Sequence, residues 1–372
     1  MGSTPSFSSA GKGAGGAAAV RQVRRSLAPG AVARPAVLLA GGGALLVVAL
    51  FLGVGIGAVG IAPQDTVAIV RAHLGLGGVG ADAQQDAILW AIRLPRVLLA
   101  ALVGGALAVS GAALQGVFRN PLADPGVIGV SSGAALGAVI AIVFGLTGQP
   151  RGGLQVSAFA AGMLTALAVY AIARFEGRTE TVTLILTGVA VAAVAGAGVG
   201  FLIARADDNQ LRDIVFWSLG SLGGATWTLL AATLPFVALG AAVCVGRARR
   251  LDLLALGERE ARHLGVETER ERILLIGAAA LATSAAVAAV GVVAFVGLVV
   301  PHLVRLAVGP GHRVLLPASL LLGAALLVLA DLVARTATAP VELPLGVVTS
   351  LIGGPFFLWL IWRTRREQGG WG

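Results

Sequence analysis

The sequence contains one cysteine and one lysine, and each shortage limits what the chain can be. Cys244 alone cannot form an intramolecular disulfide or a thiolate metal site. Lys12 is followed by Gly13 rather than by serine or threonine, so the Gly-Lys-Ser/Thr loop that cradles nucleotide phosphates is absent. Aromatic residues make up only 5% of the chain, which leaves few platforms for stacking bases. We therefore expect neither nucleotide hydrolysis by this chain nor nucleic acid as its partner.

Charged residues are also scarce, at 12%, whereas a soluble domain carries roughly 25%. Charge-free apolar runs occupy 36–64, 97–118, 125–150, 152–173, 181–204, 214–246, 273–304, 314–330 and 343–362. One transmembrane helix needs about 20 apolar residues. The run 214–246 predicts a short surface helix over 214–224 followed by a span from about Thr226 to Gly246. The run 273–304 predicts a full helix to about Val290 and a short return helix. The sequence thus predicts an all-α membrane protein with about ten transmembrane helices.

Positive charge is distributed unevenly among the segments between these runs. With the N-terminus in the cytoplasm, inner segments carry 20 of the 27 lysine and arginine residues. Cytoplasmic loops are enriched in these residues, so we expect a multi-pass protein of the cell membrane with both termini in the cytoplasm. Residues 1–35 are then a disordered cytoplasmic tail, with a transit or signal segment as the alternative. Residues 366–372 form a second cytoplasmic tail.

No ionisable residue falls near the centre of a predicted span. Asp331, the nearest candidate, lies close to the outer end of its run. Proton- and ion-coupled transporters usually carry such residues within the membrane, and the nucleotide-binding loop is missing as well. The chain therefore has no evident energy source of its own, and we expect partner subunits to supply one.

Three segments carry a family resemblance. They are RLPR at 93–96 with GGALAVSGAALQGVFRNPLADPGVIGVSSGAALG at 104–137; LGEREARHLGV at 256–266; and GVVAFVGLVVPHLVRLAVGPGHRVLLP at 291–317, with ADLVAR at 330–335 and ELPLGVVTSLIGGPFFLWL at 342–360. In this order they resemble the FecCD/BtuC-like permease family of ABC importers for iron–siderophore, haem and cobalamin complexes. The resemblance covers about residues 36–365.

This resemblance implies a type II ABC importer permease fold over 36–365, with a cytoplasmic coupling loop at 247–272. It implies a transport subunit rather than an enzyme, with no cofactor of its own; ATP and Mg²⁺ would bind a cytoplasmic ABC ATPase dimer. The other implied partners are a second permease chain, as a homodimer or a paralogous heterodimer, and an extracytoplasmic substrate-binding protein. The family's commonest cargo makes an iron(III)–siderophore the expected substrate, with cobalamin and haem as alternatives.

The resemblance also points to a cytoplasmic gate. Prolines bracket the segment around Leu122, and proline disfavours helix in the residue before it, so 120–125 should form a stiff turn between two spans. In the family this turn lies at the cytoplasmic mouth of the pathway, which makes Asn120, Pro121 and Leu122 gate candidates. Thr181 and Val182 match a second gate position at the start of the fifth span. An ordinary Asx-type turn at Asn120 is the alternative and needs no pathway.

The segment 256–266 lies in the longest charged inner loop. A short helix with a few apolar anchors can dock in a groove of a partner, and the family places its ATPase-coupling helices here. The residues implied in coupling are Leu256, Gly257, Glu258, Ala261, Leu264, Gly265 and Val266. The alternative is a solvated linker whose charges serve only solubility.

Outer arginines form the last candidate site. Arg93 and Arg96 are three residues apart and can share one helix face, and Arg335 lies at the outer end of the ninth span. In the family, arginines at these positions pair with carboxylates of the substrate-binding protein, and a guanidinium suits bidentate pairing. The alternative is snorkelling to lipid headgroups.

Two other function classes compete with the importer. A stand-alone secondary transporter or channel would need a mid-membrane ion site, and a membrane-embedded enzyme would need clustered polar residues within the spans. The coupling segment and the missing central charges favour the importer over both. None of the four histidines, His73, His263, His302 and His312, is predicted to bind a metal.

Overall fold

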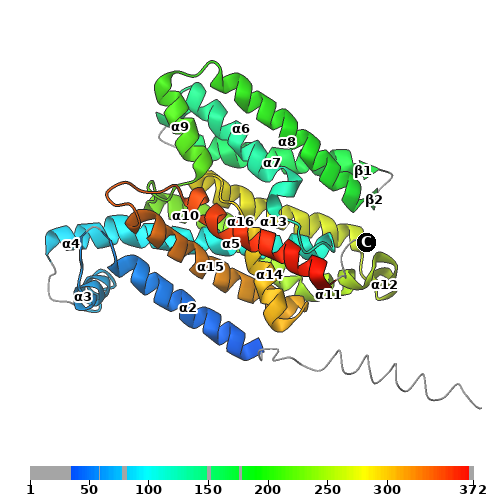
Figure 1. The fold of residues 1–372 in the computed structure, drawn as a ribbon, viewed down its shortest axis with the longest axis horizontal. Helices are drawn as coiled ribbons and strands as arrows, with labels where there is room; N and C mark the ends of the chain where they lie inside the picture. The colour runs from blue at the N-terminus through cyan, green and yellow to red at the C-terminus, as the bar shows by residue number, and fades with distance from the viewer. Residues whose placement is uncertain (1–34, 58, 78–81, 149–151, 176–177, 368–372) are drawn as a thin grey trace, which may run out of the picture.

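The computed structural model describes residues 35–57, 59–77, 82–148, 152–175 and 178–367, and Figure 1 shows them as an almost entirely helical protein. Of the predicted N-terminal tail, only Pro35 is among the described residues. Of the predicted C-terminal tail, 368–372 lies outside them. The last helix continues to Glu367, two residues past the predicted end of the permease domain.

Within this described part of the chain, eight helical segments are long and apolar enough to cross a membrane. They are α2 (Pro35–Gly55), the segment Ala83–Val117 that ends in α5 (Leu94–Val117), α7 (Gly153–Ala173), α8 (Thr181–Ile203), α10 (Trp227–Gly246), α13 (Thr268–Val290), α15 (His312–Thr336) and α16 (Leu345–Glu367). Two shorter apolar helices, α6 (Val130–Val143) and α14 (Val296–Val308), bring the number to the ten that the sequence predicts.

The remaining elements are short. They are α3 (Pro63–His73), α4 (Ala83–Ala87), the π-helical η1 (Ile88–Arg93), η2 (Pro125–Ile128), η3 (Leu146–Gly148), α9 (Asp208–Leu219), α11 (Ala248–Leu256), α12 (Glu258–His263), and a two-strand hairpin of β1 (Arg174–Phe175) and β2 (Arg178–Thr179).

The two ambiguous apolar runs fold largely as expected. Thr226 caps α10 by accepting a hydrogen bond from the Leu229 amide at 3.1 Å. The surface helix before it lies earlier than predicted, because an Asp207–Gln210 capping box starts α9 ahead of the apolar run. Helix α13 ends at Val290, where Gly291 takes a left-handed φ of 80°, and the short α14 follows.

Helix α5 is the centre of the bundle and packs against α10, α13, α14 and α15. A methyl group added at Gly104 would lie 2.2 Å from the Gly323 carbonyl oxygen of α15, and one at Gly111 would lie 1.9 Å from the Gly297 oxygen of α14. These crossings therefore require glycine, since small residues let membrane helices approach at backbone distance.

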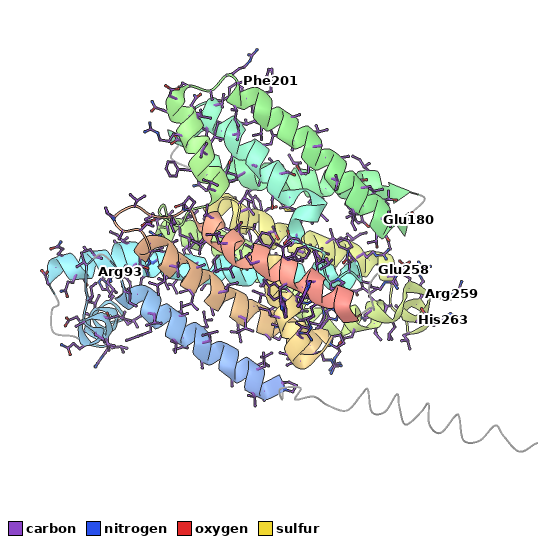
Figure 2. All side chains as sticks on the ribbon, viewed as in Figure 1. Arg93, Glu180, Phe201, Glu258, Arg259 and His263 are labelled. Carbon is purple, nitrogen blue, oxygen red and sulfur yellow. The ribbon has the colours of Figure 1, made fainter. Side chains whose placement is uncertain are left out.

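Helices α6, α7 and α8 pack on one another and, with α9, form a second layer beside the α5 layer (Figure 1). We call the end of the molecule that carries α11, α12 and the β1–β2 hairpin the coupling end. Glu258, Arg259, His263 and Glu180 lie there, and Arg93 lies at the opposite end (Figure 2). Helix α2 begins and α16 ends at the coupling end (Figure 1).

Candidate functional site

The predicted coupling segment forms helix α12 and a tight turn that leads into α13. The Gly265 amide donates to the Arg262 oxygen and the Val266 amide to the Ala261 oxygen, both at 2.9 Å. Together with the φ of 79° at Gly265, this is the Schellman helix end, in which a left-handed glycine satisfies the last carbonyls. Ala261 and Val266 are buried beneath the turn, so their side chains are not on its surface.

The same segment presents two leucines outward. Leu256 is 61% exposed and Leu264 is 58% exposed. Gly257, with a φ of 130°, turns the chain between α11 and α12. Glu258 pairs with Arg272 of α13 and lies 3.5 Å from Arg262 within its own helix. The coupling end thus has a rigid turn with exposed apolar side chains, which is what a docking helix requires.

The first turns of α13 connect this segment to neighbouring elements. Glu271 accepts a hydrogen bond from Arg247 at 2.7 Å, and Thr268 accepts one from Arg262 at 3.2 Å. Tyr170 of α7 donates from its hydroxyl to the Glu269 carboxylate at 2.5 Å. The start of α13 is therefore bonded both to the coupling loop and to the second helical layer.

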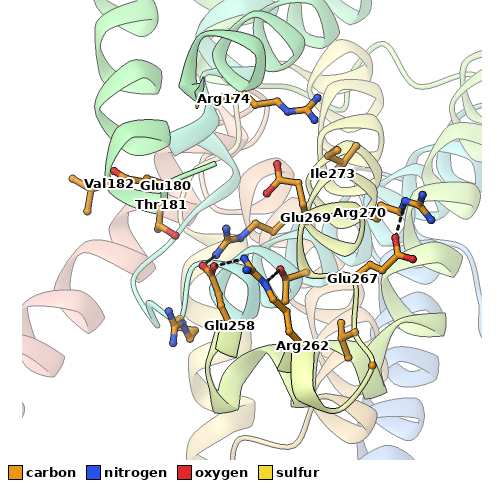
Figure 3. Close-up of a pocket in the computed structure, with 15 residues that line it drawn as sticks. Arg174, Glu180, Thr181, Val182, Glu258, Arg262, Glu267, Glu269, Arg270 and Ile273 are labelled. Atoms are coloured by element: carbon orange, nitrogen blue, oxygen red, sulfur yellow. Dashed lines mark hydrogen bonds and ion pairs between the residues drawn. The ribbon is translucent and has the colours of Figure 1, made fainter. Parts of the chain in front are cut away.

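A cavity of about 1050 Å³ opens between these elements (Figure 3). It is lined by Arg119, Arg174, Glu180, Thr181, Val182, Glu258, Arg262, Gly265, Val266, Glu267, Thr268, Glu269, Arg270, Arg272 and Ile273. The structure thus places the predicted gate residues Thr181 and Val182 around the same space as the predicted coupling residues Glu258, Gly265 and Val266, although about 80 residues of sequence separate the two sets.

The other gate candidates lie beside this cavity. Arg119, which lines it, adopts a φ of 49° where α5 ends. Asn120 accepts a hydrogen bond from the Leu122 amide at 2.9 Å, which forms the Asx turn given above as the alternative, and Leu122 is 46% exposed. Pro121 is exposed in the same turn. The chain then enters η2, which packs against α8.

Asp124 lies between this turn and η2. Its side chain accepts a hydrogen bond from the Gly126 amide at 2.8 Å and caps η2. Burial raises the pKa of Asp124, because removal from water disfavours the charged carboxylate.

The three predicted docking arginines lie at the opposite end, where Arg93 and Arg96 are buried and Arg335 is partly buried. Arg93 is only 4% exposed and donates to the Val54 and Gly55 oxygens, both at 3.0 Å. Arg335 donates to the Gly53 oxygen. All three carbonyls belong to the C-terminal end of α2.

Arg96 is bonded to two carboxylates of its own chain. It donates to Asp331 at 2.9 and 3.0 Å and to Glu342 at 2.8 and 2.9 Å. Asp331 also lies 3.6 Å from the Arg335 Nε. In this structure, carbonyl and carboxylate groups inside the chain therefore hold these arginines. Their docking role stays a prediction.

Sequence reasoning missed several residues of these clusters. Glu342 and Arg272 gave no local signal, since their partners are far away in the chain or lie across a turn. Tyr170 could have been noticed as the chain's only tyrosine, placed at the end of a predicted span. Charge at the coupling end was predicted, but its pairing was not.

Known proteins with similar sequences are membrane transport permeases, in agreement with the helical fold described above. The FecCD transport family model matches residues 45–363. The cobalamin import system permease protein of Halobacterium salinarum is 50% identical over 283 residues, which are 76% of this chain and 75% of that protein. The hemin transport system permease protein of Yersinia pestis is 49% identical over 286 residues, covering 75% of this chain and 84% of that protein.

A solved structure has the same fold over most of its length. It is described as an inward-facing conformation of a metal-chelate type ABC transporter. It matches with a TM-score of 0.77 and 35% identity, covering 87% of this chain and 98% of the solved one.

Proposed function

Because the chain belongs to the FecCD transport family and is a permease subunit of an ABC importer, we propose that its cargo is a metal–tetrapyrrole chelate, cobalamin or haem, with an iron(III)–siderophore as the alternative. The relatives at 50% and 49% identity are named for cobalamin and for hemin. This pair favours the tetrapyrroles over the siderophore that the family's commonest role suggests.

One structural observation supports the importer mechanism most directly. The cavity at the coupling end is lined by residues of the gate segment and of the coupling segment together. A force applied to α12 from outside the chain would therefore act next to the residues that close the pathway. This arrangement suits a permease whose energy comes from another subunit.

We propose the partners and orientation on the same basis. The coupling end faces the cytoplasm, where an ABC ATPase dimer binds the segment 256–266 through Leu256 and Leu264. The ATPase pair carries the ATP and Mg²⁺. A second permease chain completes the pathway, and an extracytoplasmic binding protein delivers the chelate to the opposite end. Both termini are then cytoplasmic, because α2 begins and α16 ends at the coupling end.

The binding protein needs a surface at the opposite end. If Arg93, Arg96 and Arg335 contribute to it, they must first leave their contacts with the α2 carbonyls, Asp331 and Glu342. Exposed side chains near them, such as that of Glu342 at 45% exposure, can meet a partner without this rearrangement.

The test is reconstitution of the permease in proteoliposomes with an ABC ATPase and a binding protein from the same organism. ATP-dependent uptake of cobalamin or haem, and weaker uptake of ferric siderophores, is the expected result. Omitting the ATPase should abolish uptake. Uptake that persists without the ATPase, or that follows a proton gradient, would show a secondary transporter instead. ATP-dependent uptake of siderophores alone would reverse the cargo assignment.

A further inference from the structure

We propose that the hydrogen bond between Tyr170 and Glu269 transmits displacements of α12 to the gate end of α8. This inference rests on the proposed function for its meaning in transport, but the link itself is a property of the permease chain and can be tested without its partners. Tyr170 and Glu269 act as positioning residues, since neither needs to touch the cargo.

The contact joins the two layers of the molecule at the cavity wall. Glu269 lies in the first turn of α13 and lines the cavity. The Tyr170 hydroxyl lies 2.5 Å from its Oε1 atom, although 99 residues separate the two in the chain. A hydrogen bond to a carboxylate is shorter and about twice as strong as a neutral one, so it can carry a displacement between helices.

On one side, the contact is coupled to α12. The Schellman turn at Gly265 and Val266 connects α12 to α13 through two backbone hydrogen bonds, and Ala261 and Val266 are buried beneath it. Two side-chain bonds reinforce this connection: Glu258 with Arg272, and Arg262 with Thr268 at 3.2 Å. Glu269 lies between Thr268 and Arg272, so movement of α12 must move its carboxylate.

On the other side, the contact leads to the gate. Tyr170 lies in the last turn of α7, which ends at Ala173. The β1–β2 hairpin follows directly and passes the chain to α8, whose first residues are Thr181 and Val182. The hairpin is held by the pairing of Arg174 with Thr179. This pairing places Arg174, four residues after Tyr170, beside Thr179, two residues before α8, so a displacement of Tyr170 can reach the start of α8 through it.

The first experiment uses the permease alone in lipid nanodiscs. Cys244 is replaced by alanine, and Val182→Cys reports the state of the gate through its rate of reaction with a maleimide. Glu258→Gln perturbs α12 by weakening its bond to Arg272. We expect it to change the labelling rate roughly three- to tenfold, the size expected for a hydrogen bond in an equilibrium constant. The response should be lost with Tyr170→Phe and reduced with Glu269→Gln.

The matched control is Thr187→Val, which also removes one hydroxyl from the second layer. The Thr187 hydroxyl donates a hydrogen bond to the Thr183 oxygen of its own helix, at 2.7 Å. Because this bond stays within one helix, its loss should leave the link between the layers intact, and the response to Glu258→Gln should persist. Thermal melting checks that each variant is folded. A response that survives both Tyr170→Phe and Glu269→Gln would overturn the proposal, and so would no response to Glu258→Gln in the parent.

A second arm uses the complex with its ATPase. Tyr170→Phe should keep ATP hydrolysis while transporting fewer chelate molecules per ATP. Loss of hydrolysis and transport in equal proportion would contradict the proposal, because it would indicate a structural role. If the unmodified complex shows no ATP-driven uptake, the proposed function fails, and the labelling experiment still decides whether the link exists.

Discussion

Arg96 and Asp331 form a buried ion pair that ties α5 to α15. The Arg96 Nη2 and Nε atoms lie 2.9 and 3.0 Å from Asp331 Oδ1, and the two residues are 8% and 2% exposed. Glu342 accepts two further hydrogen bonds from the same guanidinium. One arginine thus anchors two spans and the loop before α16.

Breaking this pair should destabilise the fold. Removal of one partner of a buried ion pair typically costs about 3–5 kcal/mol, because the other charge is left unpaired. We expect Asp331→Asn to lower the free energy of unfolding by less than this amount, because Glu342 still pairs with Arg96; thermal or denaturant melting in detergent measures the change. The exposed Asp208→Asn on α9 serves as the control. Equal stability of the two variants would mean that water or lipid replaces the pair.

Acid should weaken the outer part of this network through Glu342, which lies between α15 and α16. The hydrogen bond from Arg96 lowers the pKa of Glu342. A carboxylate with a lowered folded-state pKa stabilises the fold above its unfolded pKa of about 4.3, and the contribution is lost as the pH falls through the folded pKa. The melting temperature of the wild type should therefore fall more steeply below about pH 4.3 than that of Glu342→Gln. Parallel curves would contradict this.

The exposed leucines of the coupling segment should serve partner binding alone. Leu256→Asp with Leu264→Asp removes two apolar anchors that are already in water, so the free energy of unfolding should change by less than about 0.5 kcal/mol. Co-purification of the ATPase should fall strongly. Ala261→Asp, at a buried position, is the comparison and should destabilise the chain itself. ATPase recovered at wild-type levels with both leucines changed would rule out this docking surface.

Glycine at the α5–α14 crossing should be indispensable. Gly111→Ala places a methyl group 1.9 Å from the Gly297 oxygen, so the two helices must separate. Overpacking of this kind typically costs about 1–3 kcal/mol. Gly43→Ala in α2 meets no atom within 4 Å and should be neutral or slightly stabilising, since alanine favours helix. A melting temperature of Gly111→Ala equal to that of Gly43→Ala would be the unexpected result.

Orientation can be tested by labelling in whole cells or oriented vesicles. With Cys244 replaced, a cysteine at Gly309 should react only from the cytoplasmic side, and one at Thr338 only from the outside. The reason is the excess of arginine and lysine in the segments assigned to the cytoplasm. The opposite labelling at either position would invert the proposed topology.

Apolar runs and glycine positions were sufficient to predict most of the helical architecture. The break at Gly291 and the start of α10 at Thr226 are local events, decided by backbone geometry and a side-chain cap, so sequence alone located them. The start of α9 was misplaced because its polar first turn lies outside the apolar run, and hydrophobicity carries no information about such a turn.

The sequence by itself determined that this chain spans a membrane, that it contains no Gly-Lys-Ser/Thr loop, and which segments could serve as gate and coupling helix. Only the tertiary structure decided which charges remain accessible. The sequence predicts a docking surface from three outer arginines, Arg93, Arg96 and Arg335. In the structure these arginines donate their hydrogen bonds to α2 carbonyls, Asp331 and Glu342 instead. The structure also decided that Tyr170 meets Glu269. Both outcomes depend on contacts between residues far apart in the chain, and such contacts are set by how the helices pack rather than by any local pattern.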